Sequence, residues 1–447
     1  MQVSLEITSG IERKLTITLP VAGIDGEVNK RLQDLSRRVR LDGFRPGKIP
    51  MKVVKRRYGA GARQEVLGEM MQSSFVEAIQ EQKLNPAGAP SIEATSDNDE
   101  GFTFIATFEI YPEIALNEFN GISVERPVAE VQESDIDEMI ETLRQQGTTF
   151  EDVERAAELG DRITFDYVGT KAGEAFEGGS AENSTLELGS GRMVPGFEDG
   201  LVGVAAGEEK VISVTFPEDY QAEELAGQAV EFACKVHKVS GSALPELNDE
   251  FFARFGVSED GLEGFRKEVS KNMERELRQA VKNKVKNQVM DGLLKIHEVE
   301  VPSALTSQEI DRMREQAVQQ FGGMKGGFDP KQLPAELFEA DAKKRVALGL
   351  LIGEVVKQRE VKVDDERVRA MIEEMASAYQ EPQQVIDWYY SNDEQLSQIK
   401  YVVLEEQVVD TILEAAQVSE NTCSYQEAIK PAERAVEAEE ADQEETA

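Results

Sequence analysis

The chain has 447 residues, 30% charged and 40% hydrophobic, which is enough to build several domains with buried cores. Its 86 acidic residues outnumber 49 basic ones, and the net charge of −37 disfavours wholesale binding to nucleic acid or anionic lipid. No apolar run approaches the ~18 residues of a membrane span, and the N-terminus lacks a secretory-signal pattern. The two cysteines fit no disulfide or metal motif, so we expect a cytoplasmic protein without DNA or membrane partners.

The first segment, residues 1–111, combines two kinds of periodicity. Alternating apolar residues predict three strands, and longer patterns predict two helices. The strands are expected at 3–7, 15–19 and 102–110, and the helices at 24–40 and 50–82. We therefore predict an α+β domain.

Residues 112–150 look like a connector that belongs to a later helical domain. Ser134 and Asp137 resemble a capping box, in which two side chains satisfy the free N–H groups of a helix start. After them, apolar residues recur on one helical face, at Ile136, Met139, Ile140 and Leu143.

Residues 151–243 change in character. Short β-type runs alternate with frequent glycines, a pattern typical of strands joined by tight turns. We predict a compact antiparallel β domain with a short helix.

Residues 244–430 have a helical pattern throughout. Apolar residues recur every four positions from Phe265 to Leu293, which predicts one long helix with a narrow apolar stripe. Further helices are expected near 303–321, 334–358, 364–379, 382–390 and 394–416. The last stretch, 431–447, has seven acidic residues and one arginine, so we expect it to be disordered.

The β domain carries an ordered set of aromatic residues that resembles the FKBP family of prolyl isomerases. The matching segments are DYVG at 166–169, FEGG at 176–179, LGSGRMVPGFEDGL at 188–201 and FPEDY at 216–220, followed by Phe232. Members of that family isomerise Xaa-Pro bonds, whose uncatalysed rotation takes tens of seconds or more. An apolar pocket suits this reaction because the twisted amide is less polar than the planar one.

The resemblance implies that a particular set of residues forms the catalytic proline pocket. In that set, Val194 would offer its backbone N–H to the substrate carbonyl, and Phe197 stands where many relatives have tryptophan. The full set is Tyr167, Phe176, Met193, Val194, Phe197, Tyr220 and Phe232. Neither histidine, His237 or His297, has a partner cluster, so we expect no metal site and no cofactor.

A basic island interrupts this acidic chain. Between Lys30 and Arg63 there are twelve Lys and Arg residues but only two Asp, which suggests docking to a polyanion. Two glycines and two prolines within 43–50 indicate a tight exposed loop between the two predicted helices, with Phe44 and Arg45 at its tip.

This loop, GFRPGKIP, resembles the ribosome-docking signature of the bacterial trigger factor family. The resemblance extends from Met1 to about Gln426 and includes the order of the domains. It implies that the loop contacts ribosomal protein and RNA near the exit tunnel, through Gly43, Phe44, Arg45, Gly47 and Lys48. It also implies helical arms that hold nascent and unfolded polypeptides, and it leaves a weak homodimer open.

Together these observations predict a multidomain α+β protein with an α+β docking domain (1–111), an FKBP-like β domain (151–243) and an all-α domain with arms (112–150 and 244–430). The predicted function is that of a ribosome-associated chaperone and peptidylprolyl isomerase acting in protein folding or export. No P-loop is found, which agrees with action without ATP. Two alternatives remain at this point, a folding isomerase that does not bind ribosomes and a non-enzymatic holdase or adaptor.

Overall fold

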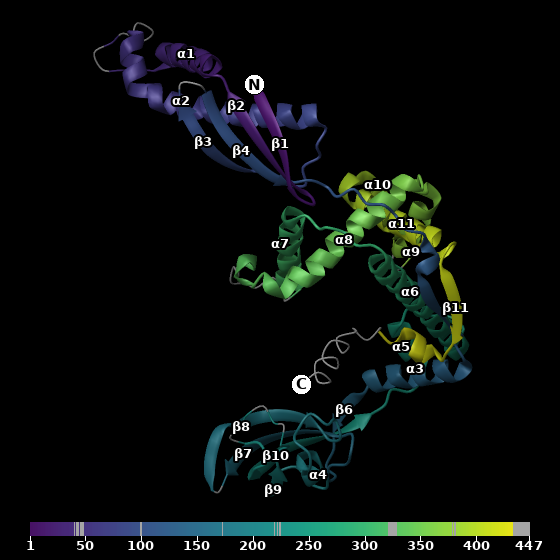
Figure 1. Cartoon of the computed structure of the whole chain (residues 1–447). Coiled ribbons are helices and arrows are strands. Elements are labelled where there is room, and N and C mark those ends of the chain that lie inside the picture. The colour runs from purple at the N-terminus through teal and green to yellow at the C-terminus, as the bar shows by residue number, and fades with distance from the viewer. Residues whose placement is uncertain are drawn as a thin grey trace, which may run out of the picture. The chain divides into compact units, whose positions relative to one another are not determined.

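The computed structural model describes residues 1–39, 41, 44, 49–98, 101–171, 173–218, 220, 222, 225–320, 329–377, 379 and 381–431. These residues form two compact units, one made of Met1–Arg126 and Asn283–Glu420, the other of Pro127–Lys282 and the chain from Asn421 onward. Figure 1 labels their helices and strands. The predicted acidic tail lies outside the described residues beyond Pro431.

The first unit begins with a four-stranded antiparallel sheet covered on one face by two helices (Figure 1). The sheet order is β1 (Gln2–Ser9), β2 (Glu12–Leu19), β4 (Gly101–Glu109) and β3 (Ser91–Asn98), and the helices are α1 (Val21–Arg38) and α2 (Met51–Gln82). Leu15, Ile17 and Phe104 from the sheet are fully buried with Ile24 and Leu32 of α1. The three predicted strands and both helices are confirmed.

Strand β3 is an element that the sequence pattern did not predict. In the described sheet it lies at the edge beside β4, and most of its described side chains are exposed on both faces. The sequence of β3 does not keep up an alternation of apolar and polar residues, so its position becomes visible through its pairing with β4.

The rest of the first unit is mainly helical, and the predicted helices are confirmed. Its described elements are η1 (Phe119–Gly121), β5 (Ser123–Val128), α7 (Ser303–Gln320), η2 (Pro330–Gln332), α8 (Glu336–Gln358), α9 (Asp365–Ala376), α10 (Pro382–Ser391), α11 (Asp393–Leu413) and β11 (Gln417–Thr422). Strand β11 was not predicted, and it pairs with β5, which lies almost 300 positions earlier. The last two residues of each of these strands belong to the second unit. Helix α6 (Gly261–Ile296) belongs to both units, and its predicted stripe is buried from Phe265 through Leu293 except for a half-buried Val281.

The second unit contains a small helical core as well as the β domain. Phe251 and Phe252 pack there with Phe265 of α6, and the core is built by α3 (Glu133–Gln146), α5 (Asp249–Arg254), α12 (Tyr425–Ile429) and the start of α6. The face predicted for α3 is confirmed, since Ile136 and Ile140 are buried in this core.

The capping box predicted for α3 is wrong by two positions. The helix begins at Glu133, so Gln132 is its N-cap residue, and Asp135 accepts the N–H of Gln132 at 2.8 Å. Ser134 already lies within the first turn, and Asp137 instead pairs with Arg266. A capping box requires a residue just outside the helix, and the apolar pattern alone did not locate that boundary.

The β domain is an antiparallel sheet with one short helix, as predicted. Strand β10 (Ala229–Ala243) is central, with β7 (Arg162–Lys171) on one side and then β8 (Glu174–Glu187) at the edge. On its other side β10 pairs with β9 (Glu209–Thr215) along its first half and with β6 (Thr149–Asp152) at its end. The helix is α4 (Phe197–Leu201).

The fold class is therefore α+β in several parts, as the sequence predicted. Among the described residues, no helix is long and apolar enough to cross a membrane.

Candidate active site

Phe232 of β10 lies at the centre of an aromatic cluster. Its ring centroid is 5.1 Å from that of Phe197, 5.8 Å from Tyr167 and 6.1 Å from Phe176, and all three contacts are edge-to-face. The four residues come from β10, α4, β7 and β8, so three strands and the short helix contribute to one cluster. Four of the seven predicted pocket residues are thus brought together by direct ring contacts.

The cluster has a buried floor and a more accessible rim. Phe197 and Phe232 are 1% and 5% exposed, whereas Tyr167 and Phe176 are half-buried. The half-buried side chains of Met193 and Val194 pack against the same core. An apolar floor below partly open walls can receive a flat, apolar ring such as that of proline.

Tyr220, the remaining predicted residue, is linked to the cluster through Phe216, which the sequence analysis did not name as a pocket residue. Its ring, 40% exposed, is 4.5 Å from that of buried Phe216, and Phe216 is 6.4 Å from Phe176. A signal for Phe216 existed, because Ile212, Val214 and Phe216 alternate along β9 and its continuation and are all buried.

Two glycines allow the ring of Phe176 to take its place. A Cβ atom at Gly179 would lie 2.6 Å from the Phe176 ring, and one at Gly169 would lie 2.8 Å from it and 2.7 Å from Phe232. All three distances are shorter than van der Waals contact. Both β7 and β8 therefore need glycine where the Phe176 ring lies against them.

The buried apolar core around this cluster also contains Cys234. Burial raises the pKa of the Cys234 thiol to about 11, so it stays protonated at neutral pH. His237 is paired with Asp166 at 2.7 Å, and both are partly exposed. Such a site suits a reaction without covalent intermediates, which depends on shape and polarity.

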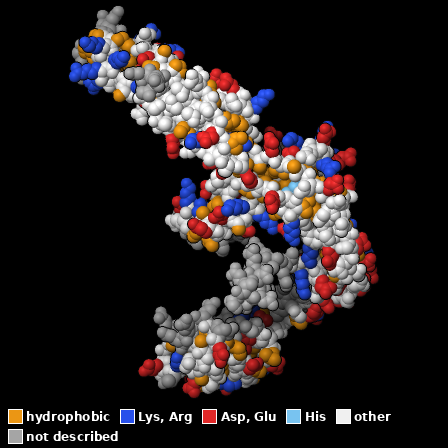
Figure 2. All heavy atoms as spheres, viewed as in Figure 1, with side chains coloured by type: hydrophobic (Ala, Val, Ile, Leu, Met, Phe, Trp, Pro, Cys, Tyr) orange, Lys and Arg blue, Asp and Glu red, His pale blue; other side chains and the backbone are white. Residues whose placement is uncertain are grey.

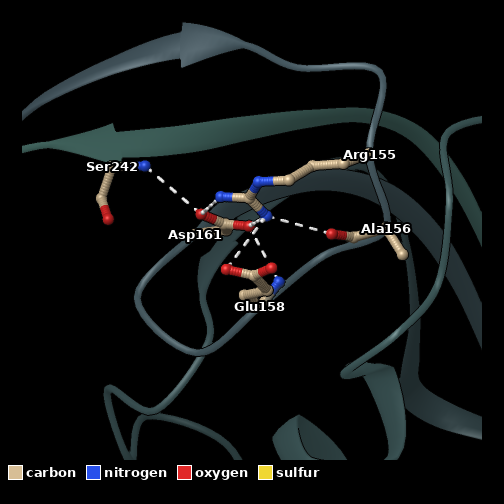
Figure 3. Close-up of polar contacts among 5 residues, drawn as sticks. All are labelled: Arg155, Ala156, Glu158, Asp161 and Ser242. Carbon is tan, nitrogen blue, oxygen red and sulfur yellow. Dashed lines mark hydrogen bonds and ion pairs between the residues drawn. The ribbon is translucent and has the colours of Figure 1, made fainter.

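A buried carboxylate, that of Asp161, connects residues near the start of the β domain with a residue near its end (Figure 3). Asp161 is 1% exposed and accepts two hydrogen bonds from the guanidinium of Arg155, at 2.5 and 3.0 Å. It also accepts the backbone N–H groups of Glu158 and Ser242, at 2.8 and 3.3 Å. Burial by itself would raise the pKa of Asp161, but Arg155 and the two N–H groups lower it below its ordinary value.

The predicted docking loop lies between α1 and α2. Of its five predicted residues the structure describes Phe44, whose side chain is 38% exposed, while Gly43, Arg45, Gly47 and Lys48 lie outside the described residues. Figure 2 shows Lys and Arg side chains gathered at this end of the two helices.

The basic residues around the loop differ in their pairing. Arg31 pairs with Glu65 and Glu69. The exposed residues nearer the loop make no ion pair within the described part of the chain, and they include Arg37, Arg38, Lys52 and Lys55. Their charge remains available to a partner.

Comparison with known proteins matches three family models along the chain. Residues 1–143 match "Bacterial trigger factor protein (TF)", residues 153–237 match "FKBP-type peptidyl-prolyl cis-trans isomerase", and residues 261–414 match the trigger factor C-terminus. The β domain with its aromatic cluster is thus an FKBP-type prolyl isomerase domain.

Curated relatives agree along almost the whole length. "Trigger factor" of Ectopseudomonas mendocina is 60% identical over 434 residues, covering 97% of this chain and 99% of that protein. The trigger factors of Pseudomonas putida and Pseudomonas fluorescens are 59% identical, also covering 97% of this chain and 99% of each relative. Both resemblances seen in the sequence are confirmed, and the chain belongs to the trigger factor family.

Proposed function

We propose that this chain is a ribosome-associated chaperone that holds nascent polypeptides without ATP and isomerises their Xaa-Pro bonds. The observation that carries the isomerase part is the aromatic cluster around Phe232 in an FKBP-type domain. The chaperone part rests on membership of the trigger factor family over 97% of the chain.

The proposed pocket consists of Tyr167, Phe176, Met193, Val194, Phe197, Tyr220 and Phe232. A proline ring would rest on Phe197 and Phe232, with Tyr167 and Phe176 at its edges. In this water-poor site the planar amide, which is the more polar form, loses more solvation than the twisted one. Part of the ~18–20 kcal/mol rotational barrier is thereby removed.

Val194 is the proposed hydrogen-bond donor to the substrate. Its carbonyl accepts the N–H of Phe197 at 3.1 Å, while its own N–H makes no hydrogen bond within the described residues. A free N–H beside the floor of the pocket can bind the carbonyl oxygen of the residue before proline and fix the direction of rotation.

A protease-free NMR exchange assay on a proline tetrapeptide tests the isomerase part. We expect the full chain to accelerate cis/trans exchange at micromolar enzyme. Tight peptide binding with no acceleration would instead favour a non-enzymatic adaptor.

The proposed docking site is the loop Gly43, Phe44, Arg45, Gly47 and Lys48, and its partners are ribosomal protein and RNA. Exposed Phe44 and the unpaired basic residues beside the loop support this. Co-sedimentation of the full chain with ribosomes tests it. Isomerase activity without co-sedimentation would mean a folding enzyme that works away from the ribosome.

We further propose a division of labour along the chain. Residues 1–111 dock, 151–243 isomerise, and 112–150 together with 244–430 hold clients, followed by a disordered acidic tail at 431–447. We also propose that the protein is cytoplasmic, and its net charge of −37 supports the absence of DNA and membrane partners. A weak homodimer is left open.

A further inference from the structure

Glu198 is a buried carboxylate without a cationic partner among the described residues. It follows Phe197, the pocket floor, as the second residue of α4, and its residue is 8% exposed. All its hydrogen bonds come from the loop 189–193 that joins β8 to α4. Oε2 accepts the N–H of Gly189 (2.8 Å) and Gly191 (3.1 Å), and Oε1 accepts the N–H of Arg192 (3.0 Å) and Met193 (3.2 Å) and the hydroxyl of Ser190 (3.2 Å).

The loop backbone is shaped around this carboxylate. Gly189 and Gly191 have φ values of +91° and +67°, which side chains rarely adopt. Left-handed glycines in a short loop turn successive N–H groups to the same side and create a concavity that binds an anion. Here the anion is supplied by the chain itself.

The hydrogen bonds keep Glu198 ionised. Burial by itself would raise the pKa of this carboxyl, but the N–H groups of Gly191, Met193 and Gly189 and the hydroxyl of Ser190 lower it below its ordinary value. A charged acceptor makes stronger hydrogen bonds than a neutral one, so the loop is held firmly.

The loop leads directly into the proposed pocket. Met193, whose N–H binds Glu198, is half-buried against the aromatic core, and Val194 follows it. The N–H of Phe197 closes the turn on the carbonyl of Val194 at 3.1 Å. Glu198 therefore connects Met193, in the wall of the proposed pocket, to Phe197, its floor. The turn between them spans the five residues 193–197.

We infer that Glu198 is a positioning residue for prolyl isomerisation, whose carboxylate holds loop 189–193 so that the Val194 N–H and the Met193 side chain stay at a fixed place above Phe197. The inference rests on the proposed pocket. Glu198 itself does not touch the substrate. It acts by fixing the position of the Val194 N–H, which binds the substrate carbonyl.

Glu198→Gln in the full chain is the direct test. The amide keeps the shape of the side chain but turns one acceptor into an NH₂ group facing backbone N–H donors. A displaced Val194 N–H costs about one hydrogen bond to the substrate, so we expect KM for a proline tetrapeptide to rise about tenfold. The value of kcat should change less.

Asp199→Asn is the matched control, because it removes the same charge from the neighbouring residue, which is exposed. Its kinetics should equal those of the wild type. A purely structural role for Glu198 would lower the folded fraction and the apparent kcat while leaving KM unchanged, and that result would overturn the inference.

Two milder variants keep the test decisive if Glu198→Gln fails to fold. Ser190→Ala removes one of the five hydrogen bonds, and Glu198→Asp keeps the charge but shortens the reach, so both should raise KM by a smaller factor. Wild-type KM in both would overturn the inference. A wild-type chain without any turnover would instead refute the proposed isomerase function, independently of every variant.

Discussion

The ring of Phe197 meets the ring of Phe232 edge-on, with centroids 5.1 Å apart and an interplanar angle of 89°. Phe197 starts the short helix α4 and Phe232 lies on the central strand β10, so this contact joins the helix to the sheet. Edge-to-face pairs add about 0.5–1.5 kcal/mol beyond the burial of their area. The floor of the proposed pocket is thus held by a direct contact between the helix and the sheet.

Phe197→Leu should lower kcat/KM for a proline tetrapeptide at least fivefold while costing about 1 kcal/mol of stability. Leucine fills part of the space but loses the flat face against which proline would rest. Phe104→Leu makes the same change at a fully buried position in the N-terminal sheet, so it serves as the control. If both variants kept wild-type turnover, the cluster would be ordinary core.

Gly179→Ala should displace Phe176 and reduce turnover several-fold, because the new Cβ would stand 2.6 Å from that ring. The same tetrapeptide assay measures the effect. Gly68→Ala on α2, where nothing lies within 4 Å of the added atom, should leave turnover intact. Equal activity in the two variants would mean that the position of Phe176 is unimportant for catalysis.

Asp161→Asn should destabilise the isomerase domain by about 2 kcal/mol at neutral pH, since a buried acceptor of four hydrogen bonds becomes a weaker, partly mismatched one. The folded pKa of Asp161 is lowered, so its contribution is complete above the unfolded value near pH 4 and is lost as the pH falls through the folded pKa. The difference between variant and wild type should therefore shrink below pH 4.

Hydrogen–deuterium exchange in β6, β7 and β10 of the full chain would measure this difference. Asp152→Asn is the matched control, because its pair with Lys238 is largely exposed and screened by solvent, so its loss should change exchange little. Faster exchange in Asp152→Asn than in Asp161→Asn would contradict the importance given to the buried pair.

Phe44→Ala should weaken co-sedimentation with ribosomes at least tenfold and leave tetrapeptide turnover unchanged, since exposed aromatic residues often dominate interfaces. Binding should also fall with added salt, because basic residues flank the loop. Tyr111→Ala removes an aromatic side chain of equal exposure, 38%, from another part of the same segment. Ribosome binding that survives Phe44→Ala at low salt would refute the docking site.

Several features of this protein were decided by the sequence alone. Alternation specified β2 and β4, and the four-residue period specified α6, because each of these elements has one buried face and its periodic pattern reports that face. Alternation also located β1, although most of its side chains are exposed. The ordered aromatic residues and glycines of the β domain, together with the GFRPGKIP loop, were sufficient to identify the family.

Other features required the tertiary structure. The edge strand β3 and the β5–β11 pair depend on distant partners, and the N-cap of α3 depends on where packing lets the helix begin. The role of Phe216 between Phe176 and Tyr220, and the convergence of four N–H groups on Glu198, depend on how loops fold back in three dimensions. Local periodicity reports which residues are buried, but it carries no information on which distant residues they meet.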